Sequence, residues 1–225
     1  MIIVHHLENS RSQRILWLLE ELGAEYEVKR YPRDPVTSLA PKALKDIHPL
    51  GKSPVITDGD IVVAESGAIV EYLMEKFGAG KLQPEDNDAA RRAHTYYMHY
   101  AEGTVMPLLI IALLLNRIDT AKMPFFVKPI AKGITGKVRE SYLTPNLTSN
   151  LKFMENTLGE STWFTGSTLT AADVHMSFIV EGLNVSIDLA KDFPNLAAFM
   201  KRCHERPAYQ KALEVGGPFE LGQRR

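Results

Sequence analysis

Ser10 stands where a short polar segment meets an amphipathic pattern, a position at which a hydroxyl can do chemistry. At a helix N-terminus a hydroxyl can donate a hydrogen bond to an anion, while free N–H groups and the helix dipole favour the same negative charge. The same residues allow a purely structural role, because Ser10 and Gln13 have the spacing of a capping box. No Gly-x-Ser-x-Gly elbow surrounds Ser10, so the pattern does not indicate a serine nucleophile.

Two further segments carry charged and hydroxyl groups at the ends of expected elements. In His48-Pro49-Leu50-Gly51-Lys52-Ser53-Pro54, Lys52 is a possible carboxylate anchor or a solvated loop lysine. Pro54 stands at a strand entrance, where it cannot donate a ladder hydrogen bond. In Glu65-Ser66-Gly67-Ala68, Ser66 could bind a ligand carboxylate and Glu65 a ligand ammonium. The alternative is an N-cap with an acid in the first turn.

The elements expected in residues 1–80 alternate between short strands and amphipathic helices. Apolar and β-branched patterns predict strands over 2–4, 26–31, 53–57 and 61–64, the last two joined by an Asp-Gly turn as a hairpin. Helical spacing predicts helices over 15–22 and 66–77, with a helical turn over 43–47. The order β-α-β-α-β-β-α places all three polar segments at junctions between elements.

The second half of the chain shows no convincing strand. A polar linker over 79–88 is followed by helical patterns over 89–117, 137–158, 170–189 and 196–206, with a break over 120–136 that holds prolines and glycines. We expect a small α/β domain over residues 1–80 and an all-helical domain over residues 88–225.

Composition excludes several classes of protein. The 225 residues include 26 basic and 27 acidic side chains, so no global field favours a phosphate polymer, and we do not expect nucleic-acid binding. A single cysteine cannot form an internal disulfide or a cysteine-rich metal site. The longest apolar run, Leu108 to Leu115, is shorter than the about 20 residues that span a bilayer, and the N-terminus does not look like a signal peptide. We therefore expect a cytoplasmic protein without a transmembrane segment.

In order and spacing, these motifs resemble the cytosolic glutathione S-transferases, in particular serine-type fungal and bacterial members. Leu7–Ile15 with Leu18–Gly23 is similar to the family's first strand and helix, and His48–Pro54 to its cis-proline loop. Glu65–Ile69 is similar to its γ-glutamyl site, and Thr165–Val174 to the capping motif of a buried helix in its second domain. The resemblance covers nearly the whole chain and implies a thioredoxin-like first domain followed by a helical bundle.

The resemblance also implies roles for individual residues. Ser10 would donate its hydroxyl proton to the glutathione sulfur, and Ser53 would pair through its backbone with the cysteinyl part, across a cis Pro54. Lys52 would meet the glycyl carboxylate, while Glu65 and Ser66 would hold the γ-glutamyl ammonium and carboxylate. Many relatives carry Val or Ile where this chain has Ser53. Asn9 and Ser12 flank Ser10, so which of the three meets the sulfur stays open, although the spacing to Arg14 favours Ser10.

An electrophile pocket is expected between the domains. Its candidate lining residues are Leu7, Asn9, Tyr96, Tyr100 and Met106, with core or dimer packing as the alternative for each. The acid of Glu102 could reach the site of a partner subunit. Cytosolic members are usually homodimers, so the resemblance implies one here.

The expected activity is transfer of the glutathione thiolate to small hydrophobic electrophiles, with glutathione as co-substrate and no metal. The alternatives on the same site are glutathione-dependent peroxidase, dehalogenase or isomerase activity. A third possibility is a non-catalytic binding module with the same fold.

Overall fold

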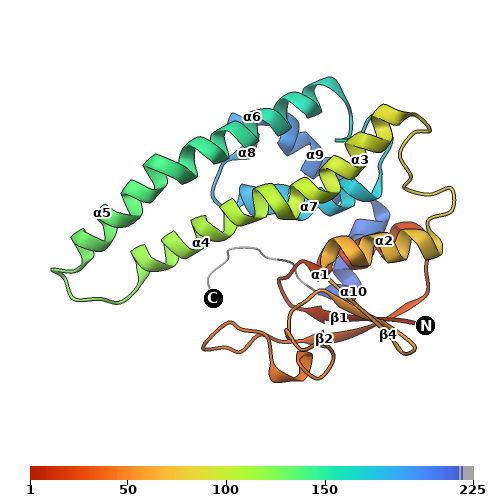
Figure 1. Ribbon diagram of the computed structural model, residues 1–225, viewed down its shortest axis with the longest axis horizontal. Coiled ribbons are helices and arrows are strands. Elements are labelled where there is room, and N and C mark those ends of the chain that lie inside the picture. Colours follow the sequence, from red (N-terminus) through yellow and green to blue (C-terminus); the bar gives the residue numbers. More distant parts are fainter. Residues whose placement is uncertain (218, 220–225) are drawn as a thin grey trace.

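Four strands form one mixed sheet at the base of the molecule (Figure 1). The computed structural model describes residues 1–217 and 219. The strands are β1 (Ile2–Leu7), β2 (Tyr26–Tyr31), β3 (Val55–Asp58) and β4 (Ile61–Ala64), in the order β2-β1-β3-β4. β1 is parallel to β2 and antiparallel to β3, which forms the expected hairpin with β4. The end of β1 and the start of β3 are therefore neighbours, which brings two of the polar segments together.

Helices α1 (Ser12–Leu22) and α2 (Ser66–Phe77) cover the face of the sheet that is turned toward the helical domain (Figure 1). In α1, Leu16 and Leu19 are fully buried, as the helical spacing of the apolar residues predicts, and Trp17 is fully buried as well. The helix ends at Gly23, whose φ of 66° suits the left-handed C-cap. The helical turn expected over 43–47 is only a short 3-10 turn, Lys42–Leu44.

Two long helical rods run side by side in the second domain (Figure 1). One rod consists of α3 (Asp88–Tyr100), a π-helical turn (Ala101–Val105) and α4 (Met106–Thr120). The other consists of α5 (Lys128–Val138), a second π-helical turn (Arg139–Leu143) and α6 (Thr144–Glu160). Around them lie α7 (Ala171–Asn184), α8 (Leu189–Asp192), α9 (Pro194–His204) and α10 (Pro207–Gly216).

The break expected over 120–136 is shorter than the prolines and glycines suggested. Only residues 121–127 separate α4 from α5, which accommodates Gly133 and Gly136. Pro129 lies in the first turn of α5 and Pro207 in that of α10, a helix that the sequence did not lead us to expect. Proline fits there because the first N–H groups of a helix have no intrahelical partner.

Helix α7 lies at the centre of a hydrophobic core that both domains share. Its residues Val174 and Ile179 belong to the same buried cluster as Leu16 and Trp17 of α1 and Phe199 of α9. The domains therefore pack as one body.

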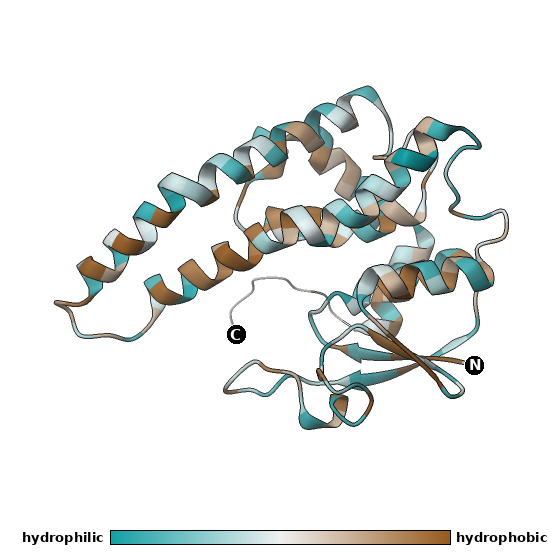
Figure 2. Cartoon of the chain, viewed as in Figure 1, coloured by the Kyte–Doolittle hydropathy of each residue, from teal (hydrophilic) through white to brown (hydrophobic). Residues whose placement is uncertain are grey.

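The rod from Asp88 to Thr120 is apolar enough, over a window of 18 residues, to cross a membrane by length and composition alone. The sequence expectation differs because it counted only the uninterrupted run Leu108 to Leu115. In the fold, 39% of that window is buried, and Figure 2 shows its most apolar part along α4. Core helices of globular proteins also meet this criterion, so the window does not by itself indicate a membrane span.

Candidate functional site

Two neighbouring cavities lie where the cis-proline loop faces the helical domain. The larger has a volume of about 700 Å³ and the smaller about 50 Å³. Both are lined by Arg11, Leu50, Lys52 and Ser53, so they form adjoining parts of one site. Ser10 and Asn9 line the larger part, while Pro54, Glu65 and Ser66 line the smaller. The structure thus brings all the residues expected to bind glutathione to one place.

Ser10 lies between the start of α1 and the cis-proline loop. Its hydroxyl shares a hydrogen bond of 2.8 Å with the Ser12 hydroxyl and donates one of 3.4 Å to Ser53 Oγ. The N–H of Ser12 donates to Ser10 Oγ over 3.3 Å. The capping box with Gln13 is not formed, because the buried Gln13 amide has no hydrogen-bond partner among the described residues. Ser10 therefore caps only the first N–H and lines the cavity.

A histidine lies behind the two serines. Ser12 Oγ lies 2.8 Å from His6 Nδ1, inside the protein. Burial lowers the pKa of His6 to about 4, and the nearby charge of Arg30 acts in the same direction. The imidazole is therefore neutral at pH 7, and a chain of hydrogen bonds runs from Ser10 through Ser12 to His6. Nothing in the local sequence marks His6 for this place.

The peptide bond between Ser53 and Pro54 is cis, as the resemblance implied. The Ser53 hydroxyl donates to the carbonyl of His5 over 3.0 Å and accepts from the N–H of Leu7 over 3.3 Å. These two bonds tie the loop to the end of β1. The hydroxyl of Ser53 thus makes contacts that an aliphatic side chain cannot.

Glu65 and Ser66 begin α2 at the far end of the site. Glu65 has a φ of 73°, a left-handed conformation that costs a non-glycine residue about 1–3 kcal/mol and that is found preferentially at functional sites. Ser66 follows as the first residue of α2, with its side chain nearly buried. The free N–H groups of that helix end favour an anion beside Ser66.

An ion pair joins the two domains behind the site. Arg14, fully buried on α1, donates to the carbonyl of His175 over 2.7 Å and pairs with Glu102 of the π-helical turn. Arg11 Nε lies 3.4 Å from the other carboxylate oxygen of Glu102. We had expected Glu102 to reach the site of a partner subunit. In its own chain, Glu102 lines the smaller cavity together with Glu65, and its reach into a partner's site stays a prediction.

The wall opposite Ser10 is apolar and comes from the helical domain. Met106, Leu109, Ile110 and Leu113 line it from α4, at the spacing of one helix face. Phe178 of α7 and Leu7 of β1 complete it. Leu7 and Met106 therefore lie in the pocket, as expected.

Tyr96 and Tyr100 do not line this pocket, and the expectation for them is wrong. The Tyr100 ring is buried and stacks on the Tyr96 ring, with the ring centroids 5.3 Å apart. Its hydroxyl donates to Asn150 Oδ1 of α6. Tyr96 lies beside Arg91 and Arg92 in a separate surface depression. Both tyrosines face α6 instead, where the rings of Tyr96 and Tyr100 contact Phe153 edge to face at 6.0 Å and 5.7 Å.

Charge is distributed unevenly along the site. Arg11, Arg33, Lys45 and Lys52 line the larger part, which has no acidic lining residue. The acids Glu65 and Glu102 line only the smaller part. Such a site suits a ligand with an ammonium group at one end and carboxylates elsewhere.

Arg33 is a lining residue that the sequence did not reveal. It donates to the carbonyl of Glu8 over 3.0 Å and to that of Asn9 over 3.1 Å. These bonds fix the segment before Ser10 from a loop that is distant in sequence. Among residues 1–217 and 219, no group of three His, Cys, Asp or Glu side chains could hold a metal ion.

Comparisons with known proteins agree with this geometry. Residues 1–75 match the family model for the glutathione S-transferase N-terminal domain, and residues 122–214 match one for the C-terminal domain. Glutathione S-transferase 3 of Schizosaccharomyces pombe is 34% identical over 95% of this chain and 87% of its own.

Two solved structures have a similar fold. A glutathione S-transferase from Actinobacillus pleuropneumoniae superposes with a TM-score of 0.77, at 32% identity over 100% of this chain and 97% of its own. A glutathione transferase homologue from Lodderomyces elongisporus, solved with two glutathione molecules per subunit, has a TM-score of 0.72 at 20% identity, covering 95% and 98% of the two chains.

Proposed function

This chain belongs to the glutathione S-transferase family, and from that premise we propose that it transfers the sulfur of glutathione to small hydrophobic electrophiles with Ser10 as the catalytic hydroxyl. The observation that carries this proposal is the position of Ser10. Its hydroxyl lines the cavity at the start of α1, opposite the apolar wall of α4. A sulfur placed there lies between a hydrogen-bond donor and the acceptor substrate.

The site offers a partner for each charged group of glutathione. Lys52 serves the glycyl carboxylate, Glu65 the γ-glutamyl ammonium and Ser66 the γ-glutamyl carboxylate. The backbone of Ser53 pairs with the cysteinyl part beside the cis Pro54. The cavity lining supports this orientation, since the acids are confined to the end that holds Glu65. The Lodderomyces homologue, solved with two glutathione molecules per subunit, supports glutathione binding by this fold.

Thiolate formation needs no metal in this site. A free thiol has a pKa near about 8.5, and a decrease of about 2 units requires about 2.7 kcal/mol of preferential thiolate stabilisation. A hydrogen bond to a charged group contributes about 1.5–3 kcal/mol, and a helix N-terminus about 0.3–1 kcal/mol. The hydroxyl of Ser10 and the start of α1 are together sufficient.

The acceptor is proposed to be small and hydrophobic because the wall that faces Ser10 is aliphatic. Met106, Leu109 and Leu113 offer no hydrogen-bond donor or acceptor apart from the weak thioether of Met106. Holding such a molecule beside the thiolate accelerates the reaction by proximity. We place the enzyme in the cytoplasm as a homodimer, in line with the family it resembles.

Replacing Ser10 tests the proposal directly. In Ser10→Ala we expect kcat with a chloronitrobenzene acceptor to fall about 10- to 150-fold, the loss of one charge-assisted hydrogen bond. The pKa of the bound thiol, measured from thiolate absorbance, should rise with it. Ser149→Ala, an exposed helix serine outside the site, is the matched control. Unchanged turnover in Ser10→Ala would remove Ser10 from the mechanism.

Two further measurements separate the alternatives. Activity with cumene hydroperoxide that exceeds activity with every tested electrophile would favour a peroxidase on the same site. Calorimetry that detects no binding of millimolar glutathione would favour a non-catalytic module.

A further inference from the structure

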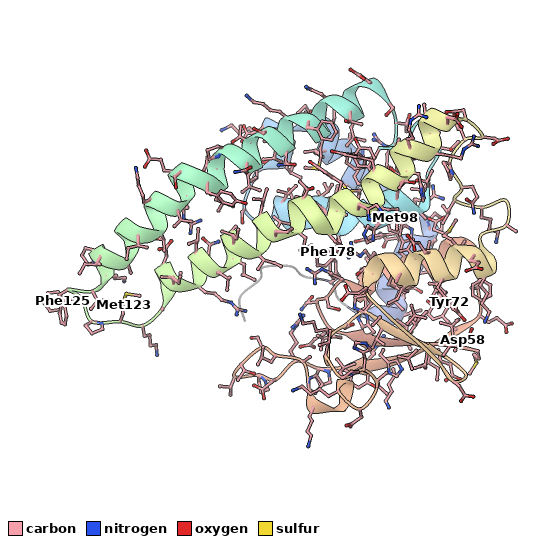
Figure 3. The ribbon with its side chains drawn as sticks, in the orientation of Figure 1. Asp58, Tyr72, Met98, Met123, Phe125 and Phe178 are labelled. Carbon is pink, nitrogen blue, oxygen red and sulfur yellow. The ribbon has the colours of Figure 1, made fainter. Side chains whose placement is uncertain are left out.

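A helical hairpin extends from the body of the molecule at the end opposite α2 (Figure 1). It consists of the last turns of α4, the connection 121–127, and α5. Figure 3 shows Met123 and Phe125 at its tip, far from the sheet. Phe125 is 86% exposed and its neighbour Phe126 64% exposed, although both are large aromatic side chains. Two adjacent phenylalanines at such a tip are costly in water unless something covers them.

The hairpin is cross-linked, so its tip is held in this place. Asp119 of α4 accepts hydrogen bonds from Thr135 of α5 over 2.5 Å and from Arg139 over 2.9 Å. Leu115 of α4 is buried near this connection, in a cluster with Val138 of α5. Because the inner face of the hairpin is already packed and hydrogen-bonded, the exposed side chains at its tip cannot fold back onto that face.

The apolar surface continues from the tip along α5. Ile130 and Ile134 are 63% and 64% exposed and lie four residues apart, so they share one helix face. We call Phe125, Phe126, Ile130 and Ile134 the hairpin patch.

Basic side chains surround this patch. Residues 113–140 hold six Lys or Arg and two acids, a net charge of +4 in a chain whose total is −1. Both acids are paired, Asp119 with Arg139 and Glu140 with Lys137. Lys122, Lys128 and Lys132 are exposed beside the patch. Aromatic and aliphatic side chains flanked by lysines are the composition of segments that lie in a membrane interface.

We propose that the hairpin patch docks on the surface of an anionic phospholipid membrane. Phe125 and Phe126 enter the boundary between headgroups and acyl chains, and the lysines face lipid phosphates. A second copy whose twofold axis passes through the hairpin patch fits less well, because that contact would place the same cluster of lysines against itself. The proposal does not rest on glutathione chemistry. Ile110 and Leu113 line the cavity, and they belong to α4, the helix that leads to the proposed docking tip.

Vesicle co-sedimentation of the full chain tests this docking. The wild-type protein should sediment with vesicles of phosphatidylcholine and phosphatidylserine but much less with phosphatidylcholine alone. The double variant Phe125→Ser with Phe126→Ser should abolish the binding. Lys122→Glu with Lys128→Glu should weaken it by at least about fivefold per lysine. Val36→Ser, which changes an equally exposed apolar residue outside the hairpin, is the matched control.

A spectroscopic readout keeps the test independent of the loss-of-binding variants. Trp17 and Trp163 are buried, so a Phe125→Trp variant would add the one exposed indole among the described residues. Its emission should shift to the blue when phosphatidylserine vesicles are added. No wild-type binding to either vesicle would overturn the proposal. So would full binding by the double serine variant, or light scattering in which that variant alone turns a dimer into a monomer.

Discussion

The hydroxyl of Ser12 determines where the hydroxyl of Ser10 can point. It lies 2.8 Å from Ser10 Oγ on one side and 2.8 Å from His6 Nδ1 on the other. When Ser12 donates to the neutral imidazole, its oxygen can accept from Ser10, so the Ser10 proton can point to Ser12, to Ser53 Oγ at 3.4 Å or to a ligand in the cavity. Ser12 is thus a positioning residue for the proposed chemistry.

In Ser12→Ala we expect kcat to fall about three- to tenfold, with little change in KM for glutathione, because about 1 kcal/mol of orientation is lost. Ser12→Thr, which retains the hydroxyl, should recover most of the rate. The pKa of the bound thiol should rise modestly in Ser12→Ala, a change that a merely structural role would not produce. If Ser12→Ala loses the thiolate altogether while Ser10→Ala retains it, Ser12 is the residue that meets the sulfur.

At this scale the sequence predicted residues that lie next to one another in local motifs. Lys52, Ser53 and Glu65 stand at element ends, where the order of the motifs indicates a shared purpose. Arg33 and His6 were not predicted because their roles depend on contacts between segments distant in sequence. No local pattern records such contacts.

Helix α7 is fixed at its start by a capping box, which lies in the segment Thr165–Val174 that resembles the family's capping motif. Thr170 and Asp173 form both reciprocal bonds, and the carboxylate of Asp173 also accepts the N–H of Phe164 over 2.7 Å. The hydroxyl of Thr165 donates to the same carboxylate over 3.3 Å. One buried acid therefore satisfies four donors around the first turn of the central helix.

Asp173→Ala should destabilise the protein by about 3–5 kcal/mol, because it leaves several buried donors without an acceptor. Asn87 provides a matched control, since its side chain caps α3 at the surface by accepting the N–H of Ala90 over 2.8 Å. Asn87→Ala should cost only about 1 kcal/mol. Urea unfolding midpoints measure both. Equal losses in the two variants would show that the burial of Asp173 adds nothing.

The elements were predicted wherever periodicity and end signals agreed. All four strands and both helices of the first domain lie where alternation and helical spacing placed them. The start of α5 was missed because Pro129 was counted within a break, whereas it lies in the first turn of the helix. The last predicted helix ended at Arg206, and α10, which begins at Pro207, was not predicted. Proline is disfavoured in the interior of a helix but not in its first turn, and the local sequence does not separate the two cases.

Mild acid should destabilise the whole molecule through its buried histidines. Burial lowers the pKa values of His5, His6, His94 and His175, so the folded state resists protonation that the unfolded chain accepts. Their contribution is complete above pH 6.5 and is lost as the pH falls toward 4. Burial raises the pKa of Asp173 to about 6, which acts in the opposite direction over that window.

Because four imidazoles oppose one carboxyl, we expect the net unfolding free energy to decrease with acidification, by up to about 1.4 kcal/mol per pH unit for each proton taken up. Thermal unfolding followed by circular dichroism at pH 7.5, 6.5 and 5.5 checks the sign. A Tm that is constant or rises toward pH 5.5 would contradict it.

The sequence predicted that the chain divides at the polar linker, but it did not predict how the two domains pack against each other. Arg14 and Glu102 are 88 residues apart and their pairing depends on both domains. Trp17 of α1 contacts Tyr209 of α10 edge to face at 5.3 Å, so the end of the helical part returns to the first domain. Such contacts depend on how whole helix faces pack against each other in three dimensions. Hydrophobic periodicity along the sequence does not specify that packing.

The row of aliphatic side chains on α4 has a practical consequence for protein engineering. Met106, Leu109, Ile110 and Leu113 all belong to α4, whereas the groups assigned to the tripeptide belong to the first domain. Randomising these four positions would therefore sample new acceptor preferences while leaving thiol activation intact. A library randomised at these four positions is a compact starting point for directed evolution of this enzyme.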